Sequence, residues 1–248
     1  MTSIETPQEL TPDARSGSVL LSFSVAYSSL ARCIDIGDAA GIKSAVEGTL
    51  AGCARELGIP ELARSLEKAS EALRAPGIEE KLSQEHTRLF SLSDALPYES
   101  AYDHPSRRLA LISDIAGFMR AFGVESSEER PDFVGTELEF SGFLALLEAR
   151  AELAGEPERS QVARDARRTF IAEHAGRWLG ALAHRIREKS ATQVYPALLD
   201  AARALLVTDA AMLGADVEEV NPHLEPSDGS QSDCSGCAVM AGTSGGAT

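Results

Sequence analysis

The apolar positions of this chain recur mainly with helical spacing. Near the start, one stripe advances by three or four residues at a time, through Leu20, Phe23, Tyr27, Leu30 and Ile34. Such a stripe lies on one face of a helix and predicts that this face packs against a core. Further helices are predicted at 38–57, 61–74, 78–90, 105–122, 131–153, 158–189 and 192–213. Long runs with the period of two that strands require are missing, so the predicted fold class is all-α, a single bundle of about eight helices.

Proline and glycine punctuate these segments where helix ends are expected. Pro60, Pro105 and Pro131 suit the first turn of a helix, where the missing amide donor does no harm. Gly58 and Gly123 follow helical patterns and suit C-terminal caps.

The composition of the ends predicts how the chain is organised. Residues 1–18 are expected to be a flexible N-terminus and residues 19–220 the helical domain. Residues 221–248 are rich in Gly, Ser and Thr and hold too little apolar surface to offset the entropy of ordering, which predicts a disordered C-terminal tail. Residues 91–104 form a polar, proline-containing loop between two predicted helices.

The chain is acidic, and its charge limits the chemical classes of partner that it can bind. It has 38 Asp and Glu against 23 Lys and Arg, for a formal net charge of −15. That charge repels nucleic-acid phosphates and anionic lipid surfaces, so we expect neither nucleic acid nor stable membrane insertion. A basic or apolar partner fits better.

The sequence also predicts a cytoplasmic location. No basic stretch precedes an apolar one at the start, and we expect no later run to reach the roughly 20 apolar residues that span a bilayer. Cys33 and Cys53 lie in helical patterns, far from the close pair Cys234 and Cys237. This is unlike the dense disulfide framework of a small secreted domain and favours a reducing compartment.

The motifs of common enzymes are missing. The five histidines, His86, His104, His174, His184 and His223, show no metal-ligand spacing on one helix. No GxSxG elbow between a predicted strand and a helix, no P-loop and no strand-linked GxGxxG occurs. His174 lies between Ile171 and Trp178 on one predicted face, which favours a histidine at the edge of the core over a catalytic one. We therefore predict no catalytic residue, no cofactor and no enzyme activity.

One cysteine motif allows a different interpretation. Cys234 and Cys237 have the CxxC spacing of half a zinc site or of a redox dithiol, with His223 as a weak third ligand. In a flexible tail this spacing is more often incidental or regulatory. A metal- or thiol-dependent helical protein acting through these weak candidates is the alternative function.

Five segments in a fixed order resemble the TorD/NarJ family. They are EHTRLFS at 85–91, PYES at 97–100, ERPDFVGTELEFSGFLALL at 129–147, FIAEHAGRWLGALAHRI at 170–186 and the closing helix at 192–213. The family carries E-x-x-x-LF, P-x-ES, an acidic Pro-Asp-His segment opening an ELEF helix, and F-x-x-x-H-x-x-x-W-L. In the first three segments, the matching residues are Glu85, Leu89, Phe90, Pro97, Glu99, Ser100, Glu129, Pro131, Asp132, Glu137, Leu138, Glu139 and Phe140. The resemblance covers about residues 19–213.

The matched residues also have plain structural interpretations. Phe133 stands where the family usually has histidine, so a function specific to that imidazole is not expected here. Phe133, Phe140 and Leu144 form a helical stripe that includes Glu137, which needs a partner if buried and is solvated if at the stripe's edge. Asp132 suits a helix start, near the positive end of the backbone dipole.

The resemblance implies a system-specific assembly chaperone. Its partner would be the immature catalytic subunit of a molybdopterin-dependent oxidoreductase, or that subunit's twin-arginine signal peptide, and it would assist cofactor insertion before export. The molybdopterin cofactor would belong to the client. Acidic and aromatic side chains complement arginines followed by an apolar segment. The predicted binding residues are Phe90, Pro97, Tyr98, Glu99, Ser100, Asp132, Phe133 and Glu137.

Two questions stay open at this stage. The chaperone could read the signal peptide or bind the folded body of its client. It could also be a monomer or a homodimer, since bundles can exchange elements through a flexible loop such as 91–104.

Overall fold

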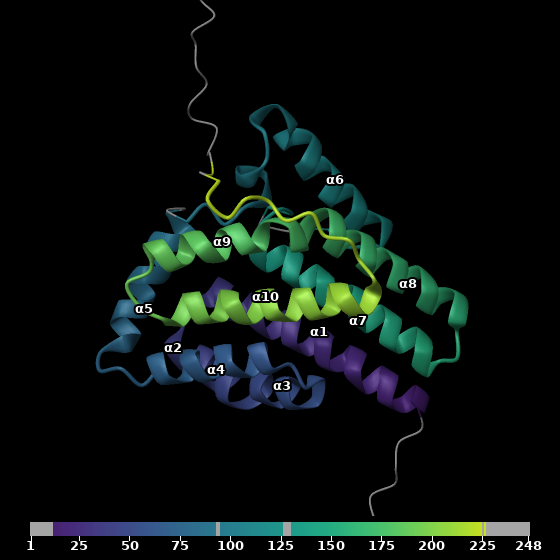
Figure 1. Cartoon of the computed structure of the whole chain (residues 1–248), viewed down its shortest axis with the longest axis horizontal. Helices are drawn as coiled ribbons and strands as arrows, with labels where there is room; N and C mark the ends of the chain where they lie inside the picture. Colours follow the sequence, from purple (N-terminus) through teal and green to yellow (C-terminus); the bar gives the residue numbers. More distant parts are fainter. Residues whose placement is uncertain (1–11, 93–94, 126–129, 225, 227–248) are drawn as a thin grey trace, which may run out of the picture.

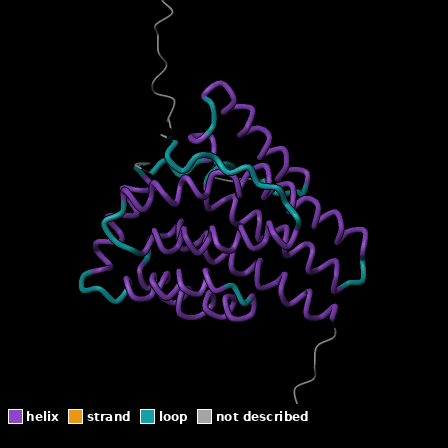
Figure 2. The backbone as a smooth tube through the Cα atoms, viewed as in Figure 1, coloured by secondary structure: helices purple, strands orange, loops and turns teal. Residues whose placement is uncertain are grey.

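The computed structural model describes residues 12–92, 95–125, 130–224 and 226, and all regular secondary structure in these ranges is helical (Figures 1 and 2). The α-helices are α1 (Pro12–Ile36), α2 (Ala39–Ser44), α3 (Ala51–Leu57), α4 (Pro60–Ala72), α5 (Ile78–His86), α6 (Arg108–Ala121), α7 (Val134–Leu153), α8 (Pro157–Phe170), α9 (Gly176–Lys189) and α10 (Val194–Leu213). The predicted all-α fold is confirmed.

Wider π-helical turns join several of these helices end to end. They are η1 (Ala45–Leu50), η2 (Thr87–Ser91) and η5 (Ile171–Ala175). Counting α2 to α3, α5 with η2, and α8 to α9 as continuous segments leaves eight helices in the described ranges, the number predicted. Two of the π turns fall inside the family motifs, at 87–91 and 171–175, and such turns are frequent at functional sites.

Helix α10 runs through the middle of the bundle. It packs against α4 on one side and α9 on the other, with α1 and α7 behind it in the view of Figure 1. Most of its side chains are buried, including Tyr195, Leu198 and Leu205. Helix α6 projects from one end of the bundle. The core therefore lies around α10, and α6 is attached at its edge.

Helices α1 and α7 pack closely because two glycines of α7 face α1. A Cβ atom at Gly142 would lie 2.9 Å from the carbonyl oxygen of Ser24 and 3.0 Å from the Cβ of Tyr27. At Gly135 a Cβ would lie 2.7 Å from the ring of Phe133 and 3.8 Å from the carbonyl of Ala31. A side chain at either position would push the helices apart or displace that ring.

A buried ionic cluster ties α1 and α7 to α8 and α10. Arg167 lies 2.8 Å from Glu148 and 3.0 Å from Asp209, and all three are at most 3% exposed. The hydroxyl of Tyr27 donates to Asp209 at 3.0 Å. Burial raises the pKa of Asp209 to about 6, although Arg167 lowers it. The partners are needed because an unpaired charge here would be strongly destabilising.

Several predicted boundaries are confirmed and others are corrected. Pro60 opens α4, and Gly58 is a left-handed cap with φ 62°. Pro131 and Asp132, however, precede α7, which begins at Val134 with Phe133 as its N-cap, so Asp132 does not cap the helix. Helix α1 begins at Pro12, inside the range 1–18 expected to be flexible. The tail from 227, with Cys234 and Cys237, lies outside the described residues.

The membrane prediction also needs correction. Residues Gly17–Asp35 of α1 are long and apolar enough, by length and composition, to cross a bilayer. Of that stretch, 56% is buried inside the protein, where it packs on α7 and α10. The core helix of a soluble protein passes the same test, so this one helix is weak support for a membrane span.

Candidate functional site

Two family motifs that are distant in the sequence meet in space. Tyr98 and Phe133 form an isolated antiparallel bridge. The amide of Glu99 donates to the carbonyl of Asp132 at 2.9 Å, and the amide of Val134 donates to that of Pro97 at 3.0 Å. The PYES loop is thereby fixed against the turn that enters α7.

Arg130 and Asp132 clamp this crossing. Asp132 is fully buried and accepts hydrogen bonds from two nitrogens of the Arg130 guanidinium, Nε at 3.0 Å and Nη2 at 2.7 Å. Arg130 Nη2 also donates to the Ser100 hydroxyl at 2.9 Å, and the guanidinium lies 4.3 Å from the centre of the Tyr98 ring. The amide of Ser100 donates to Asp132 at 3.2 Å. These contacts satisfy the carboxylate and hold the loop in place.

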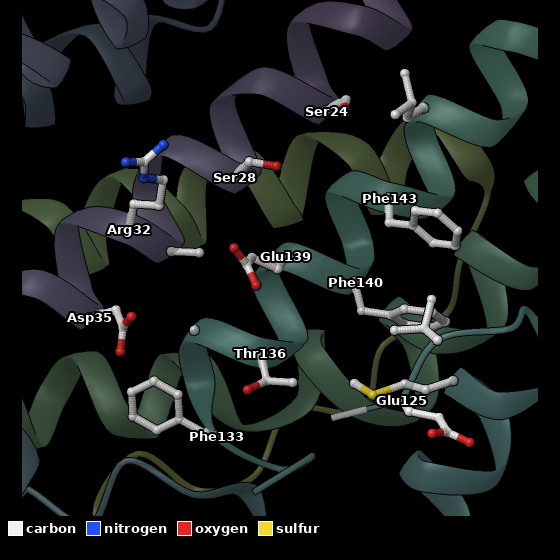
Figure 3. A pocket seen from close by; sticks show the side chains of 15 residues that line it. Ser24, Ser28, Arg32, Asp35, Glu125, Phe133, Thr136, Glu139, Phe140 and Phe143 are labelled. Carbon is white, nitrogen blue, oxygen red and sulfur yellow. The ribbon is translucent and has the colours of Figure 1, made fainter. Parts of the chain in front are cut away.

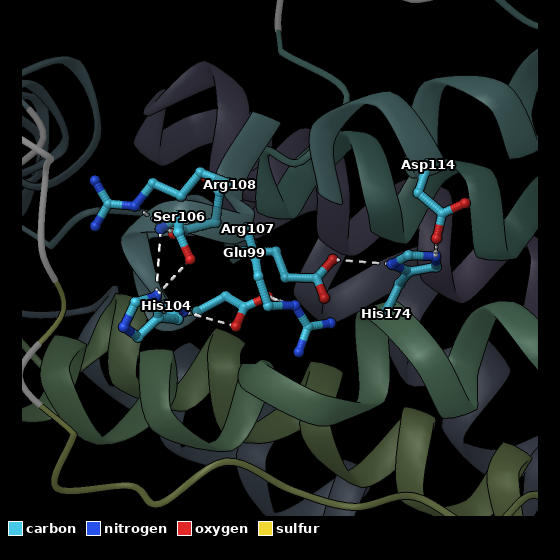
Figure 4. Close-up of polar contacts among 9 residues, drawn as sticks. Glu99, His104, Ser106, Arg107, Arg108, Asp114 and His174 are labelled. Carbon is cyan, nitrogen blue, oxygen red and sulfur yellow. Dashed lines mark hydrogen bonds and ion pairs between the residues drawn. The ribbon is translucent and has the colours of Figure 1, made fainter. Parts of the chain in front are cut away.

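A second polar chain runs from this loop to α6 and η5. Nδ1 of His174 lies 3.2 Å from a carboxylate oxygen of Glu99, and Nε2 lies 3.8 Å from Asp114 of α6 (Figure 4). His174 and Glu99 are buried, whereas Asp114 is exposed. His174 thus links the loop to the outer helix, a role its spacing in the sequence did not predict.

Glu137 is buried and has a partner, which settles the alternatives left open by the sequence. Its Oε2 accepts a 2.8 Å hydrogen bond from the indole N–H of Trp178. Burial raises the pKa of Glu137 well above its usual range, and the neighbouring carboxylate of Glu99 raises it further. The physical cause is that a second negative charge is disfavoured in a site sheltered from water. Burial and the nearby negative charge therefore favour the neutral form of Glu137 over its carboxylate.

Phe90 lies in a different cluster from the other predicted residues. Its ring packs edge-on against Tyr195 of α10, with centroids 5.1 Å apart, and lies 5.4 Å from His86. On the same helix, Glu85 accepts from the amide and hydroxyl of Thr192 and from the amide of Ala191. The E-x-x-x-LF motif therefore joins α5 to the start of α10.

An open groove lies beside the crossing, between α1 and α7 (Figure 3). Its volume is about 660 Å³. Arg32 and Asp35 reach it from α1, and Thr136 and Glu139 from α7. Its apolar lining comprises Ala31, Met119, Val124, Phe133, Phe140, Phe143 and Leu146. Exposed carboxylates at Asp35, Glu125 and Glu139 thus stand around phenylalanine rings.

The structure places the eight predicted residues in three situations. Phe133 lines the groove. Six others lie around the crossing of the two loops: Pro97, Tyr98, Glu99, Ser100, Asp132 and Glu137. Of these six, all but Tyr98 are buried. Phe90 packs on α10. The sequence did not predict Arg32 and Asp35 as site residues, because their place on the polar face of α1 was the only signal. Glu139, His174 and Trp178 matched the family motifs but were not predicted as binding residues.

The described residues include no group of three or more His, Cys, Asp or Glu side chains able to hold a metal ion. His223 packs against His184, with ring centroids 4.7 Å apart.

Comparison with known proteins identifies the family. The model of the family described as nitrate reductase delta subunit matches residues 56–184. The chain is also 34% identical over 108 residues to the perchlorate reductase assembly chaperone protein of Dechloromonas aromatica (strain RCB). That match covers 42% of this chain and 47% of the relative, so it spans about half of each. No solved structure matches. The family match includes the buried crossing and the residues of α7 and α9 that support it. The chain therefore belongs to the nitrate reductase delta subunit family, which is the TorD/NarJ family of assembly chaperones, whose members are not themselves catalysts.

Proposed function

We propose that this protein is a cytoplasmic chaperone that binds the immature catalytic subunit of a molybdopterin-dependent oxidoreductase and assists cofactor insertion before export. Membership of the family supports the chaperone role, and the name of the perchlorate reductase relative supports a reductase as client. The chaperone holds no cofactor of its own in this proposal. It breaks no bond and acts by occupying a surface of the client until assembly is complete.

The observation that carries the proposal is the chemistry of the groove between α1 and α7. Asp35, Glu125 and Glu139 are exposed there, beside the half-buried ring of Phe143. Carboxylates bind guanidinium groups through charge-assisted hydrogen bonds, and an apolar floor accepts the side chains that follow. A twin-arginine signal peptide offers both features in one segment, so we propose that it is the part of the client bound in the groove.

The buried predicted residues have a supporting role in this proposal. Glu99, Asp132 and Glu137 are at most 4% exposed and are held by His174, Arg130 and Trp178. Reaching a client arginine would require these contacts to break. We propose instead that they fix the turn that places Phe133 in the floor of the groove, while the exposed carboxylates of the groove meet the client's arginines and the half-buried ring of Phe143 contacts its apolar segment.

The proposal is tested by fluorescence anisotropy with a labelled peptide that contains the client's two arginines and the apolar stretch after them. Glu139→Lys places a positive charge against those arginines, and we expect it to weaken binding about ten-fold or more, because like charges at an interface are strongly unfavourable. Phe143→Ala is expected to weaken binding through lost apolar contact.

A matched control is Glu67→Lys, which makes the same charge change at an exposed position of α4, outside the groove. If both lysine variants weakened binding equally, net charge alone would explain the effect and the groove would not be the site. If the client lacking its signal peptide bound as tightly as the complete client, the folded body would be the target.

A further inference from the structure

An extended segment after α10 lies back across the bundle. Residues 214–224, here called the strap, leave α10 through Gly214, which has φ 63°, and the amide of Ala215 closes the helix end on the carbonyl of Ala210 at 2.9 Å. The strap then runs along α9, as the last stretch of loop in Figures 1 and 2. It is not helical and has no strand partner among the described residues.

A few contacts near the surface hold the strap. The amide of Val220 donates to the carbonyl of Arg177 at 2.8 Å. Both carboxylate oxygens of Glu219 accept from Arg203 of α10, at 3.0 and 3.1 Å, and these two side chains are 40% and 46% exposed. Exposed ion pairs of this kind contribute little to stability. The strap is therefore held more weakly than the helices beneath it.

The surface under the strap is shaped for an extended chain. The side chains of the strap alternate between the two sides: Ala215 and Val217 are half-buried, and Asp216 and Glu218 are exposed. Two glycines of α9 let the strap approach the helix closely: a Cβ at Gly176 would lie 3.1 Å from Val217, and one at Gly180 would lie 3.1 Å from the Glu219 carboxylate. Larger residues there would hold any extended segment away from the helix.

The strap does not fill this surface. A cavity of about 240 Å³ remains between it, α9 and α10. Its walls are largely apolar and include Ile171, Leu179, Leu206, Val207 and Ala210. Arg203 stands at the edge of the cavity beside Glu219. The unfilled volume can accept aliphatic side chains larger than Ala215 and Val217.

We propose that the groove between α9 and α10 is a second peptide-binding surface, which the strap covers and from which an extended acidic segment of a partner polypeptide displaces it. The occupant presents aliphatic side chains at alternate positions to the cavity, places a carboxylate on Arg203 and donates a backbone N–H to the carbonyl oxygen of Arg177. The strap makes each kind of contact itself: Ala215 and Val217 are its half-buried side chains, Glu219 binds Arg203, and the Val220 amide donates to the carbonyl of Arg177. This surface shares no lining residue with the groove between α1 and α7 and takes the opposite charge, so the inference does not rest on the proposed function.

The test uses the full-length protein and a labelled peptide with the sequence of residues 214–224. In the wild type the strap competes at a high effective concentration, so the peptide binds weakly. Glu219→Ala loosens the strap but leaves Arg203 for the carboxylate of the peptide. We expect about two- to five-fold tighter peptide binding and a similar increase in hydrogen exchange at the Val220 amide, the range that loss of an exposed ion pair gives.

Two variants control for the loss of charge and for the recognition of the carboxylate. Glu218→Ala removes an exposed carboxylate from the same segment and should leave peptide binding and exchange at their wild-type values. Arg203→Ala also frees the strap but removes the recognising group, so exchange should rise while peptide binding stays low. Equal binding by the Glu219 and Glu218 variants, or tight binding by the Arg203 variant, would overturn the proposal. Thermal unfolding confirms that each variant is folded.

Discussion

The indole N–H of Trp178 donates a 2.8 Å hydrogen bond to Glu137, and this bond joins α9 to α7 beneath the crossing of the two loops. Both residues lie within segments that resemble the TorD/NarJ family, so one buried contact explains two of its motifs in physical terms. The raised pKa of Glu137, caused first by burial and then by the charge of Glu99, favours the uncharged carboxylic acid in this bond.

Glutamine should therefore replace Glu137 with little loss. Glu137→Gln keeps an oxygen for Trp178 and matches the neutral acid in shape, so we expect a change of less than about 1 kcal/mol in the free energy of unfolding at pH 7. Glu137→Ala leaves the indole N–H unpaired and opens a cavity, and should cost about 2–4 kcal/mol. Urea unfolding measures both. Equal losses for the two variants would contradict this prediction.

Arg130 should stabilise the crossing far more than an ordinary surface arginine does. Arg130→Ala removes the cation paired with the fully buried Asp132, and leaving that carboxylate without it should cost about 2–4 kcal/mol. The comparison is Arg159→Ala, because Arg159 pairs with Glu156 at the surface and its loss should cost less than about 1 kcal/mol. The prediction is wrong if chemical denaturation gives the same loss for both.

Glu85 should hold the turn that leads into α10. Its carboxylate accepts from the amides of Ala191 and Thr192, and it is 3% exposed. Glu85→Ala leaves these donors without that partner and should destabilise the protein by about 2–4 kcal/mol. Glu80→Ala, on the exposed side of the same helix, should change stability by less than about 0.5 kcal/mol. Melting temperatures that fall equally in the two variants would argue against this role of Glu85.

Asp209 should make stability depend on pH. Its pKa is raised to about 6, so the folded protein holds the proton more tightly than the unfolded chain, where an aspartate titrates near about 3.9. The stabilising contribution is complete below the unfolded value and is lost as pH rises through about 6, by at most about 3 kcal/mol. Asp209→Asn cannot titrate and removes this slope.

The measurement compares Asp209→Asn with the wild type at pH 4 and pH 7. Relative to the wild type, the variant should become more stable as pH rises, whatever the constant effect of the substitution. Asp200→Asn, at a partly exposed aspartate paired with Arg187, is the control and should show a much smaller change between the two pH values.

The sequence predicted the helices well because each is a local pattern. The stripe from Leu20 to Ile34 is buried as predicted, and the segment 158–189 is one continuous helix despite its π turn. The start of α7 was placed too early because proline suits both a first helical turn and the turn that precedes it. Here the backbone of Asp132 and Val134 bonds to the PYES loop instead of starting the helix.

The site was predicted less well because it depends on contacts between distant segments. The sequence brought Glu99, Asp132 and Glu137 together correctly, through the motifs that carry them. It could not show that His174, Arg130 and Trp178 would cover their carboxylates, since burial depends on how whole helices pack. The open groove was missed for the same reason: one of its walls is α1, whose residues Arg32 and Asp35 belong to no motif.

The most direct test of the central claim is to purify the tagged protein from its native host while molybdenum enzymes are being made, and to identify bound polypeptides by mass spectrometry. The account predicts recovery of one catalytic subunit that is poor in molybdopterin, and loss of that subunit with Glu139→Lys but not with Glu67→Lys. Recovery of no such subunit, or of one already loaded with its cofactor, would contradict the proposed role in assembly.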